Sequence, residues 1–248
     1  MRKPIVLVGT LYSNEGDFEK CCASVNGQRD VTVIHRVISN LNEKDAHNAL
    51  WDEHRKLWPN FDVFVKVDAD MVLRSTTTLK EICECLESRQ ATSLRAPLHD
   101  YMTDKLINGM HAYTNKVTFT ETTDALYCDR NACMNDSMIL VEKDLPSSLR
   151  PVGKHCHYAT PIQAFRYAYH RSIKNQRDTM QDLIYAWRRH GDRTRGMGVI
   201  AVMLAAKLVK LHGSDYNDAA FDASFRDAER RYDEYVQAIN ENRLDVFD

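Results

Sequence analysis

Glycine and proline are scarce in this chain. Nine Gly and six Pro among 248 residues exclude a low-complexity or collagen-like protein. Hydrophobic residues make up 44% and charged residues 27%, which is ordinary globular usage. A chain of this length can bury the core of one α/β domain, alone or with an appended helical part. We therefore expect a folded protein built around a single catalytic domain.

Neither sign of charge dominates, and no apolar run is long. Thirty-three Lys and Arg against thirty-five Asp and Glu leave a formal charge of −2, so no global field attracts nucleic acid or anionic lipid. The longest apolar stretch, 196–211, contains Lys207 and Lys210 and is shorter than the ~20 apolar residues that span a bilayer. We expect no transmembrane segment. The same stretch fits a buried helix or one facing a second copy in a homo-oligomer.

The seven cysteines follow no regular spacing. An odd, scattered set does not make the disulfide framework of a small secreted protein, so a reducing cytoplasm is the expected location. The first ten residues contain only the short apolar run Ile5–Val8, without the longer apolar region and cleavage site of a signal peptide. We interpret this run as the first strand.

Strand-like and helix-like patterns alternate over the first hundred residues, which predicts βαβ units. Strands are expected at 4–10, 31–38, 61–67 and 93–98, and helices near 17–25, 42–58 and 78–89. Residues 100–151 show only short β-like pieces among polar loops, and four helical segments follow, at 163–174, 178–189, 198–211 and 221–240. The sequence predicts an α/β fold with a mainly parallel, Rossmann-like sheet over 1–158 and a helical C-terminal region over 159–248.

Two aspartates directly follow the third expected strand. Asp68 and Asp70 would lie at the carboxyl edge of the sheet, where open α/β sheets bind ligands. Because alternate strand residues point to opposite faces, both carboxylates reach one ion only if the chain turns at Ala69. Hard oxygen ligands suit Mg²⁺ or Mn²⁺, which complete their shells with phosphates and water. The pair therefore predicts a divalent ion that carries a nucleoside diphosphate.

Four ordered elements surround this pair, and together they resemble the family 2-like glycosyltransferases of the GT-A fold over about the first 75 residues. The elements are a first strand with its loop, the signature Ser24-Val25-Asn26-Gly27-Gln28, a polar helix containing Asn48, and the strand 64–67 ending in Asp68-Ala69-Asp70. Where that family commonly has an acidic residue after the second strand, this chain has Ser39-Asn40.

The resemblance implies a loop from Thr10 to Asn14 that cradles the nucleotide, Asp70 as a direct metal ligand, and Asp68 beside the ribose or the metal. The metal ligands it implies are Asp68, Asp70 and His155. The donor-binding residues it implies are Thr10, Tyr12, Asn14, Asn40, Asn48, Lys66, Asp68, Arg166 and Arg171.

A second cluster, around Lys154-His155-Cys156-His157, is similar to the segment in which many GT-A enzymes place a metal-binding His and basic residues for the diphosphate. Imidazole tolerates Mn²⁺, and Arg166, Arg171 or Lys174 could stabilise the charge on a leaving diphosphate. His155 and His157 would point to opposite sides of an extended segment, so one faces the metal, and we choose His155.

The function implied is transfer of a sugar from a nucleoside-diphosphate donor, with a UDP-sugar expected, to a hydroxyl acceptor on a glycan, lipid, protein or modified nucleobase. An inverting reaction needs a carboxylate within ~3 Å of the acceptor hydroxyl. The candidates are Asp124, Asp129 and Asp136, and we choose Asp129.

Three alternatives stay open. A nucleotidyltransferase would also place carboxylates and a metal beside a nucleotide, although the chain lacks the Gly-rich basic loop usual in that class. A non-catalytic nucleotide-sugar-binding or scaffold protein would use Asp68 and Asp70 only to cap a loop. A zinc site of Cys128, Cys133, His155 and His157 has unusual ligand spacing. His47 and His54 lie on a polar helix and are expected to be solvated.

Overall fold

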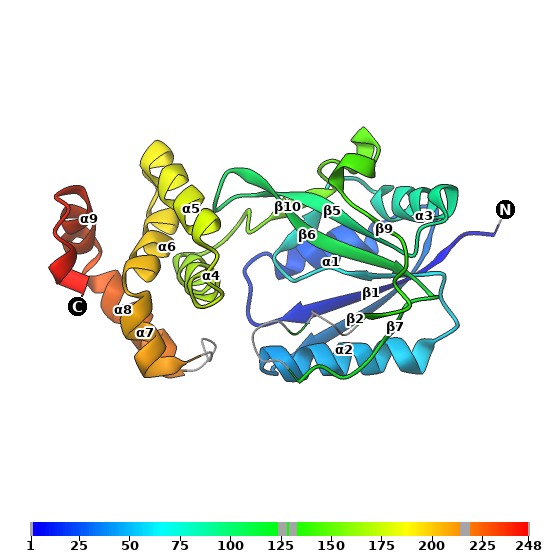
Figure 1. Cartoon of the computed structure of the whole chain (residues 1–248), viewed down its shortest axis with the longest axis horizontal. Helices are drawn as coiled ribbons and strands as arrows, with labels where there is room; N and C mark the ends of the chain where they lie inside the picture. Colours follow the sequence, from blue (N-terminus) through cyan, green and yellow to red (C-terminus); the bar gives the residue numbers. More distant parts are fainter. Residues whose placement is uncertain (1, 124–127, 129–132, 214–218, 248) are drawn as a thin grey trace. The chain divides into compact units, whose positions relative to one another are not determined.

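The computed structural model describes residues 2–123, 128, 133–213 and 219–247. The larger sheet has the strand order β2-β1-β3-β6-β5-β10-β4, and β9 pairs with β5 off this path (Figure 1). Its strands are β1 (Ile5–Tyr12), β2 (Thr32–Ser39), β3 (Val63–Lys66), β4 (Met71–Leu73), β5 (Ser93–Asp100), β6 (Lys105–Thr114), β9 (Ile139–Leu140) and β10 (Gly153–His155). A separate small sheet pairs β7 (Thr118–Phe119) with β8 (Cys133–Met134).

The sheet is parallel at one side and mixed at the other. Strand β1 pairs in parallel with both β2 and β3, as the alternating pattern predicts. Strand β6 is antiparallel to both β3 and β5, and β10 is parallel to β5 but antiparallel to β4. The carboxyl ends of β1, β3, β5 and β10 therefore meet at one edge. The predicted α/β class, with a Rossmann-like sheet flanked by helices, is confirmed.

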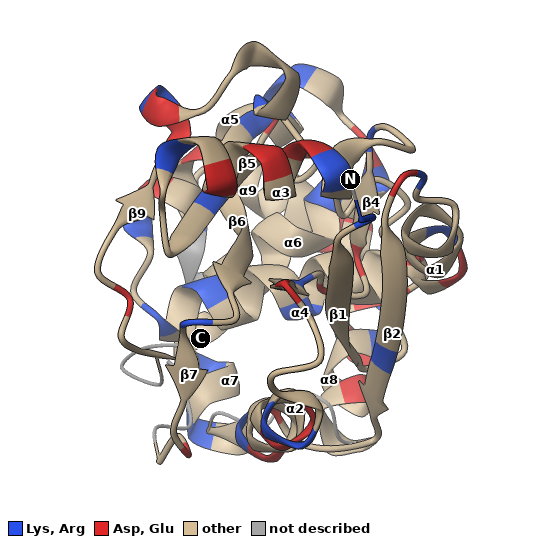
Figure 2. Ribbon diagram, turned by 90° about the vertical axis from the view of Figure 1, so that its right-hand side faces the viewer, with Lys and Arg blue, Asp and Glu red and all other residues tan. Residues whose placement is uncertain are grey.

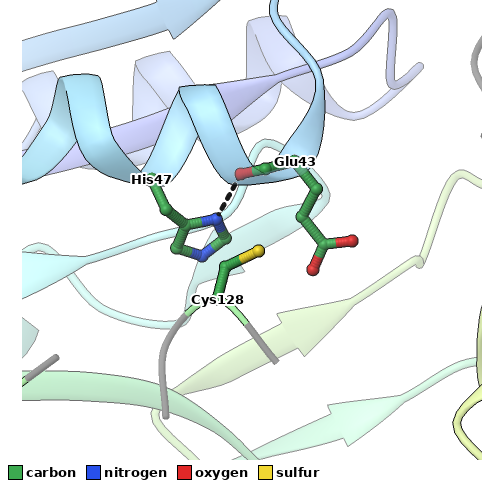
Figure 3. A group of neighbouring side chains, drawn as sticks. All are labelled: Glu43, His47 and Cys128. Carbon is green, nitrogen blue, oxygen red and sulfur yellow. Dashed lines mark hydrogen bonds between the residues drawn. The ribbon is translucent and has the colours of Figure 1, made fainter. Parts of the chain in front are cut away.

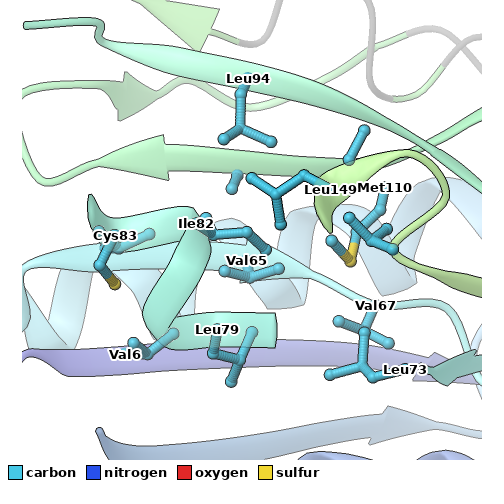
Figure 4. Packing of buried hydrophobic residues seen from close by; sticks show 14 of the residues in the cluster. Val6, Val65, Val67, Leu73, Leu79, Ile82, Cys83, Leu94, Met110 and Leu149 are labelled. Atoms are coloured by element: carbon cyan, nitrogen blue, oxygen red, sulfur yellow. The ribbon is translucent and has the colours of Figure 1, made fainter. Parts of the chain in front are cut away.

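Two hydrophobic cores explain why the strands take these positions. Val6 and Val8 of β1 face the core that contains the helices α1 (Phe18–Asn26) and α3 (Thr78–Arg89), shown in Figure 4. Leu7, between them in sequence, faces the opposite core under α2 (Glu43–Leu57), where Trp51 stacks on Phe119. Because alternate residues of β1 point to opposite faces, apolar side chains of this strand are buried on both faces of the sheet.

Strand β6 is the main element that the sequence patterns did not predict. Asn108, Gly109 and His111 interrupt its apolar character, so the run 105–114 does not read as a buried strand. Its partners decide the structure instead, because β3 and β5 supply ladder hydrogen bonds along both of its edges.

The C-terminal region is helical, as expected. Its helices are α4 (Pro161–Ile173), α5 (Arg177–His190), α6 (Arg193–Met203), α7 (Ala205–His212), α8 (Ala219–Arg230) and α9 (Tyr232–Asn240). The expected helices 198–211 and 221–240 are each divided, at Leu204 and at Arg231. Short 3-10 turns occur at Glu142–Asp144, Ser147–Leu149 and Leu244–Phe247. Within the described residues, none of the helices has the length and hydrophobicity needed to cross a bilayer.

The chain divides into two compact units. The first comprises Met1–Tyr101 and Lys105–His157, and the second comprises Met102–Asp104 and Tyr158–Asp248. In the first unit, basic and acidic residues are interspersed along α2 and α3 (Figure 2). These two helices therefore present no surface of a single sign.

Candidate active site

A turn presents the two aspartates at the carboxyl edge of the sheet. After β3, the N–H groups of Val67 and Ala69 donate to the carbonyls of Gly9 and Leu11, so the chain follows β1 past the strand end. The N–H of Met71 then donates to the Asp68 carbonyl at 2.9 Å, which closes the turn at Ala69. The turn required by the sequence argument is present.

His155 lies beside Asp70 because of backbone register. As the last residue of β10, it is paired with Met71 of β4 on one side and with Asp100 of β5 on the other. Its Nε2 is 3.2 Å from Asp70 Oδ2, and its Nδ1 is 2.7 Å from Asp100 Oδ1. Asp100 is fully buried. The structure thus aligns carboxylate, imidazole and carboxylate from three separate segments.

Charge surrounds this buried imidazole. Burial alone would lower the pKa of His155, but the carboxylates of Asp70 and Asp100 outweigh it and raise the pKa well above its ordinary value. In the absence of another cation, the ring is an imidazolium held between two acids. A metal ion at Nε2 would replace that proton, while Asp100 would keep the proton on Nδ1 and fix the ring.

Cys156 completes the group. The ligand atoms of Asp70, His155 and Cys156 lie within 4.8 Å of one another. Burial raises the pKa of the Cys156 thiol, so it stays protonated and donates to Asp70 Oδ2 at 3.3 Å. A carboxylate and an imidazole with a neutral thiol behind them fit Mn²⁺ better than Mg²⁺, which prefers oxygen ligands. Asp68 is not a member of this group, and its Oδ1 is 2.9 Å from Lys66 Nζ.

Glu15 is a third acid near the pair. Burial, followed by the charges of Asp70 and Asp68, raises its pKa from 4.5 to about 7, although its carboxylate accepts a hydrogen bond from the N–H of Ser13 at 2.6 Å. The sequence reading missed Glu15, Asp100 and Cys156. Asp100 had a readable signal, because it lies two residues after the predicted strand 93–98, at the same edge of the sheet as Asp68.

We expect Glu15→Gln to stabilise the metal-free protein at pH 8 but not at pH 4. Since the folded pKa of Glu15 is raised, the unfolded chain loses its proton first, and stability falls as pH rises from 4.5 to about 7. Gln keeps the contact to Ser13 without a charge, so a gain of about 1–3 kcal/mol is expected above pH 7. Urea denaturation in EDTA measures it, with the exposed Glu19→Gln as control. Equal stability of variant and wild type at pH 8 would contradict the account.

The signature residues Ser24 and Gln28 hold the chain that follows Asp70. The Ser24 hydroxyl accepts from the Leu73 N–H at 3.1 Å. The Gln28 amide donates to the Ser75 carbonyl and accepts from the Leu79 N–H, at 2.7 and 2.9 Å. These contacts fix β4 and the start of α3 on α1, so the signature positions the chain that follows Asp70.

The residues expected to bind the nucleotide lie in different structural environments. Thr10 lies within β1, which continues to Tyr12, and its buried hydroxyl is 3.0 Å from His35 Nε2. The expected loop therefore begins only after Tyr12. Tyr12 stacks on Phe18, and Asn14 and Asn40 adopt left-handed backbone angles (φ of 70° and 62°) after β1 and β2.

The remaining predicted donor residues have protein partners. The Asn48 side chain makes two hydrogen bonds to the backbone of Thr122, at 2.8 and 3.1 Å. In the helical unit, Arg166 forms an ion pair with Asp222 at 2.7 Å, and Arg171 donates to Gln176 at 2.9 Å. Each of these three side chains therefore makes a hydrogen bond or an ion pair within its own unit.

The candidate bases separate into two groups. Asp124 and the chosen Asp129 lie outside the described residues. Asp136 accepts hydrogen bonds from Thr92 and Ser93 at 2.7 and 2.9 Å, beside the first residue of β5 and thus away from its carboxyl end.

The histidines also separate by environment. His157 Nε2 is 3.2 Å from Lys154 Nζ, and burial with that charge lowers the pKa of His157. The expectation that His47 and His54 are solvated is wrong, since their exposed fractions are 4% and 1%. Burial lowers the pKa of both, to about 4 for His54, which lies against Phe61, Phe64 and Phe119.

Comparison with known proteins gives a structural match but no sequence match. No protein-family model matches the chain, and no curated protein sequence matches it. Among solved structures, it is similar to the mannosyltransferase PcManGT from Pyrobaculum calidifontis, determined with GDP-Man and Mn²⁺. The alignment covers 95% of this chain and 84% of that one, at 11% identity and a TM-score of 0.39.

Proposed function

We propose that this protein is a metal-dependent glycosyltransferase that moves a sugar from a nucleoside-diphosphate sugar to a hydroxyl acceptor. The observation that carries the proposal is the alignment of Asp70, His155 and Asp100 at the carboxyl edge of the sheet. Carboxylate and imidazole donors suit Mn²⁺, and this edge is where α/β sheets bind nucleotides. The sequence resemblance around Asp68 and Asp70 supports the same conclusion.

Asp70 and His155 would hold the ion, and Asp100 would orient His155. When bound, a divalent ion neutralises the charge that develops on a leaving diphosphate. Asp68 and Lys66 form a pair at the same turn. The Lys66 ammonium, on a side chain that is only 14% exposed, would bring a positive charge beside Asp68 that could stabilise the donor's anionic oxygens.

The nucleotide would lie over the carboxyl ends of β1 and β2, beside Tyr12, Asn14 and Asn40. We propose 1–158 as the catalytic domain and 159–248 as a helical C-terminal region. Asp129 is the proposed base that takes the proton of the acceptor hydroxyl.

Donor hydrolysis tests this proposal. The full chain is incubated with Mn²⁺ and, in turn, UDP-, GDP- and TDP-sugars, and release of the nucleoside diphosphate is measured. Mn²⁺-dependent release from at least one donor, with a UDP-sugar expected, supports a glycosyltransferase. Absence of release and of any thermal shift across the panel would favour a non-catalytic scaffold. Pyrophosphate release from a nucleoside triphosphate and a sugar phosphate would instead indicate a nucleotidyltransferase.

A further inference from the structure

A second group of metal-ligating side chains, which shares no residue with the Asp70 group, lies at the start of α2. Glu43, His47 and Cys128 each present one ligand atom, and these atoms lie within 4.8 Å of one another. Figure 3 shows the Cys128 thiol between the His47 ring and the Glu43 carboxylate. His47 and Cys128 are 4% and 1% exposed, so the group is largely removed from water.

The His47 ring is oriented for metal binding. Its Nδ1 lies 2.8 Å from the Glu43 backbone carbonyl, one turn earlier in the same helix. A carbonyl only accepts hydrogen bonds, so Nδ1 carries the proton and the lone pair is on Nε2. Histidines that bind metals commonly have their second ring nitrogen fixed in this way. Glu43 and His47, four residues apart, share one face of α2.

Thr122 and Cys133, which precede and follow Cys128 in the sequence, both have defined partners. Before it, the Asn48 side chain binds the N–H and the carbonyl of Thr122. After it, Cys133 is paired with Phe119 in the small β7–β8 sheet. Asn48 follows His47 directly, so the helix that supplies two of the ligand atoms also binds Thr122, which lies six residues before Cys128.

We propose that Glu43, His47 and Cys128 bind a thiophilic divalent cation, with Zn²⁺ as the first choice. Thiolate, imidazole and carboxylate are the three donor types of zinc sites in proteins. Cys128 would release its proton to solvent on binding, and the thiolate with the Glu43 carboxylate would balance the 2+ charge. Three protein ligands leave a fourth tetrahedral position for water. The proposal is independent of sugar transfer.

This site differs in chemistry from the one at Asp70. Cys156 there is a hydrogen-bond donor to a carboxylate, and the donors aimed at a cation are oxygen and nitrogen. At Glu43 the thiol itself is one of three candidate ligands. A thiophilic ion should therefore select the α2 site, and Mn²⁺ the site at Asp70.

Cobalt substitution tests the proposal with the full chain. Co²⁺ added to the metal-free protein under reducing conditions is expected to give thiolate-to-cobalt absorption, which Zn²⁺ abolishes. Cys128→Ser should remove this absorption, whereas Cys133→Ser and Cys156→Ser should keep it. In Glu43→Gln, which alters a partly exposed side chain, zinc affinity should fall by at least about 10-fold, because a direct ligand contributes no less than an outer-shell partner.

Either of two results would overturn the proposal. Wild-type protein without thiolate-to-cobalt absorption and without tight zinc binding has no site at α2. Absorption lost in Cys156→Ser but retained in Cys128→Ser would move the ion to the Asp70 group and equally refute it. Circular dichroism establishes that each variant is folded, and Glu43→Gln provides the affinity test if Cys128→Ser does not fold.

Discussion

Asp70→Ala is expected to lower sugar transfer by about 10³-fold or more, as expected when a group that stabilises developing charge is removed. Asp70 is the acid that lies 3.2 Å from His155, so its loss removes one half of the proposed metal pair. The variant should also fail to bind a nucleotide-sugar in the presence of Mn²⁺. Steady-state kinetics and calorimetric titration of the donor, each with and without Mn²⁺, measure the two effects.

Two further variants separate charge from structure. Asp70→Asn keeps the size of the side chain and loses only the negative charge, so its transfer rate should fall nearly as far as that of Asp70→Ala. Asp52→Ala removes an exposed acid on α2 and should leave the rate unchanged. Donor hydrolysis and transfer at the wild-type rate in both Asp70 variants, with Mn²⁺ present, would rule out the proposed role.

The second large effect is expected at Asp100, which acts through His155. In Asp100→Ala the buried Nδ1–H of His155 loses its acceptor, and the affinity for Mn²⁺ should fall by about 10- to 100-fold. Asp100→Asn can still accept that hydrogen bond, so its loss should be smaller. Unfolding free energy should fall by about 1–3 kcal/mol in the Ala variant, because a buried donor is left unsatisfied.

The dependence on metal concentration distinguishes positioning from general damage. If Asp100 only orients His155, saturating Mn²⁺ restores most of kcat in Asp100→Asn, and the concentration needed for half-maximal activity rises. Asp136→Asn is the matched control, since Asp136 is an acid hydrogen-bonded beside the first residue of the same strand. A reduced kcat with unchanged Mn²⁺ dependence would show that Asp100 has no part in metal binding.

Sequence patterns predicted the elements whose conformation is determined by residues close to them in the chain. The strands β1, β2 and β3, the helices between them and the turn at Ala69 follow from apolar runs and turn chemistry. Strand β6 did not, because its place depends on antiparallel pairing, with the preceding strand β5 on one side and with the more distant strand β3 on the other. His47 and His54 were misread for a related reason: their helix is polar on average, yet these two positions face an aromatic core.

The candidate site shows the same limit. Asp68 and Asp70 were found because the motif is contiguous, and strand alternation indicated that only one of His155 and His157 faces the metal. Asp100 and Cys156 were missed because their roles arise only when β5, β10 and β4 are placed side by side. Glu15 was missed because its behaviour comes from burial near two other acids, which no spacing encodes.

The ladder between β4 and β10 has one more consequence. Because His155 is opposite Met71, and the N–H of Cys156 donates to the carbonyl of Asp70 at 2.9 Å, main-chain hydrogen bonds set the separation of the two candidate ligands. The two candidate ligands are therefore already in position before a cation binds. Little of the binding free energy would be lost in ordering the polypeptide. The positions of these two backbones should therefore coincide in crystals grown with and without manganese.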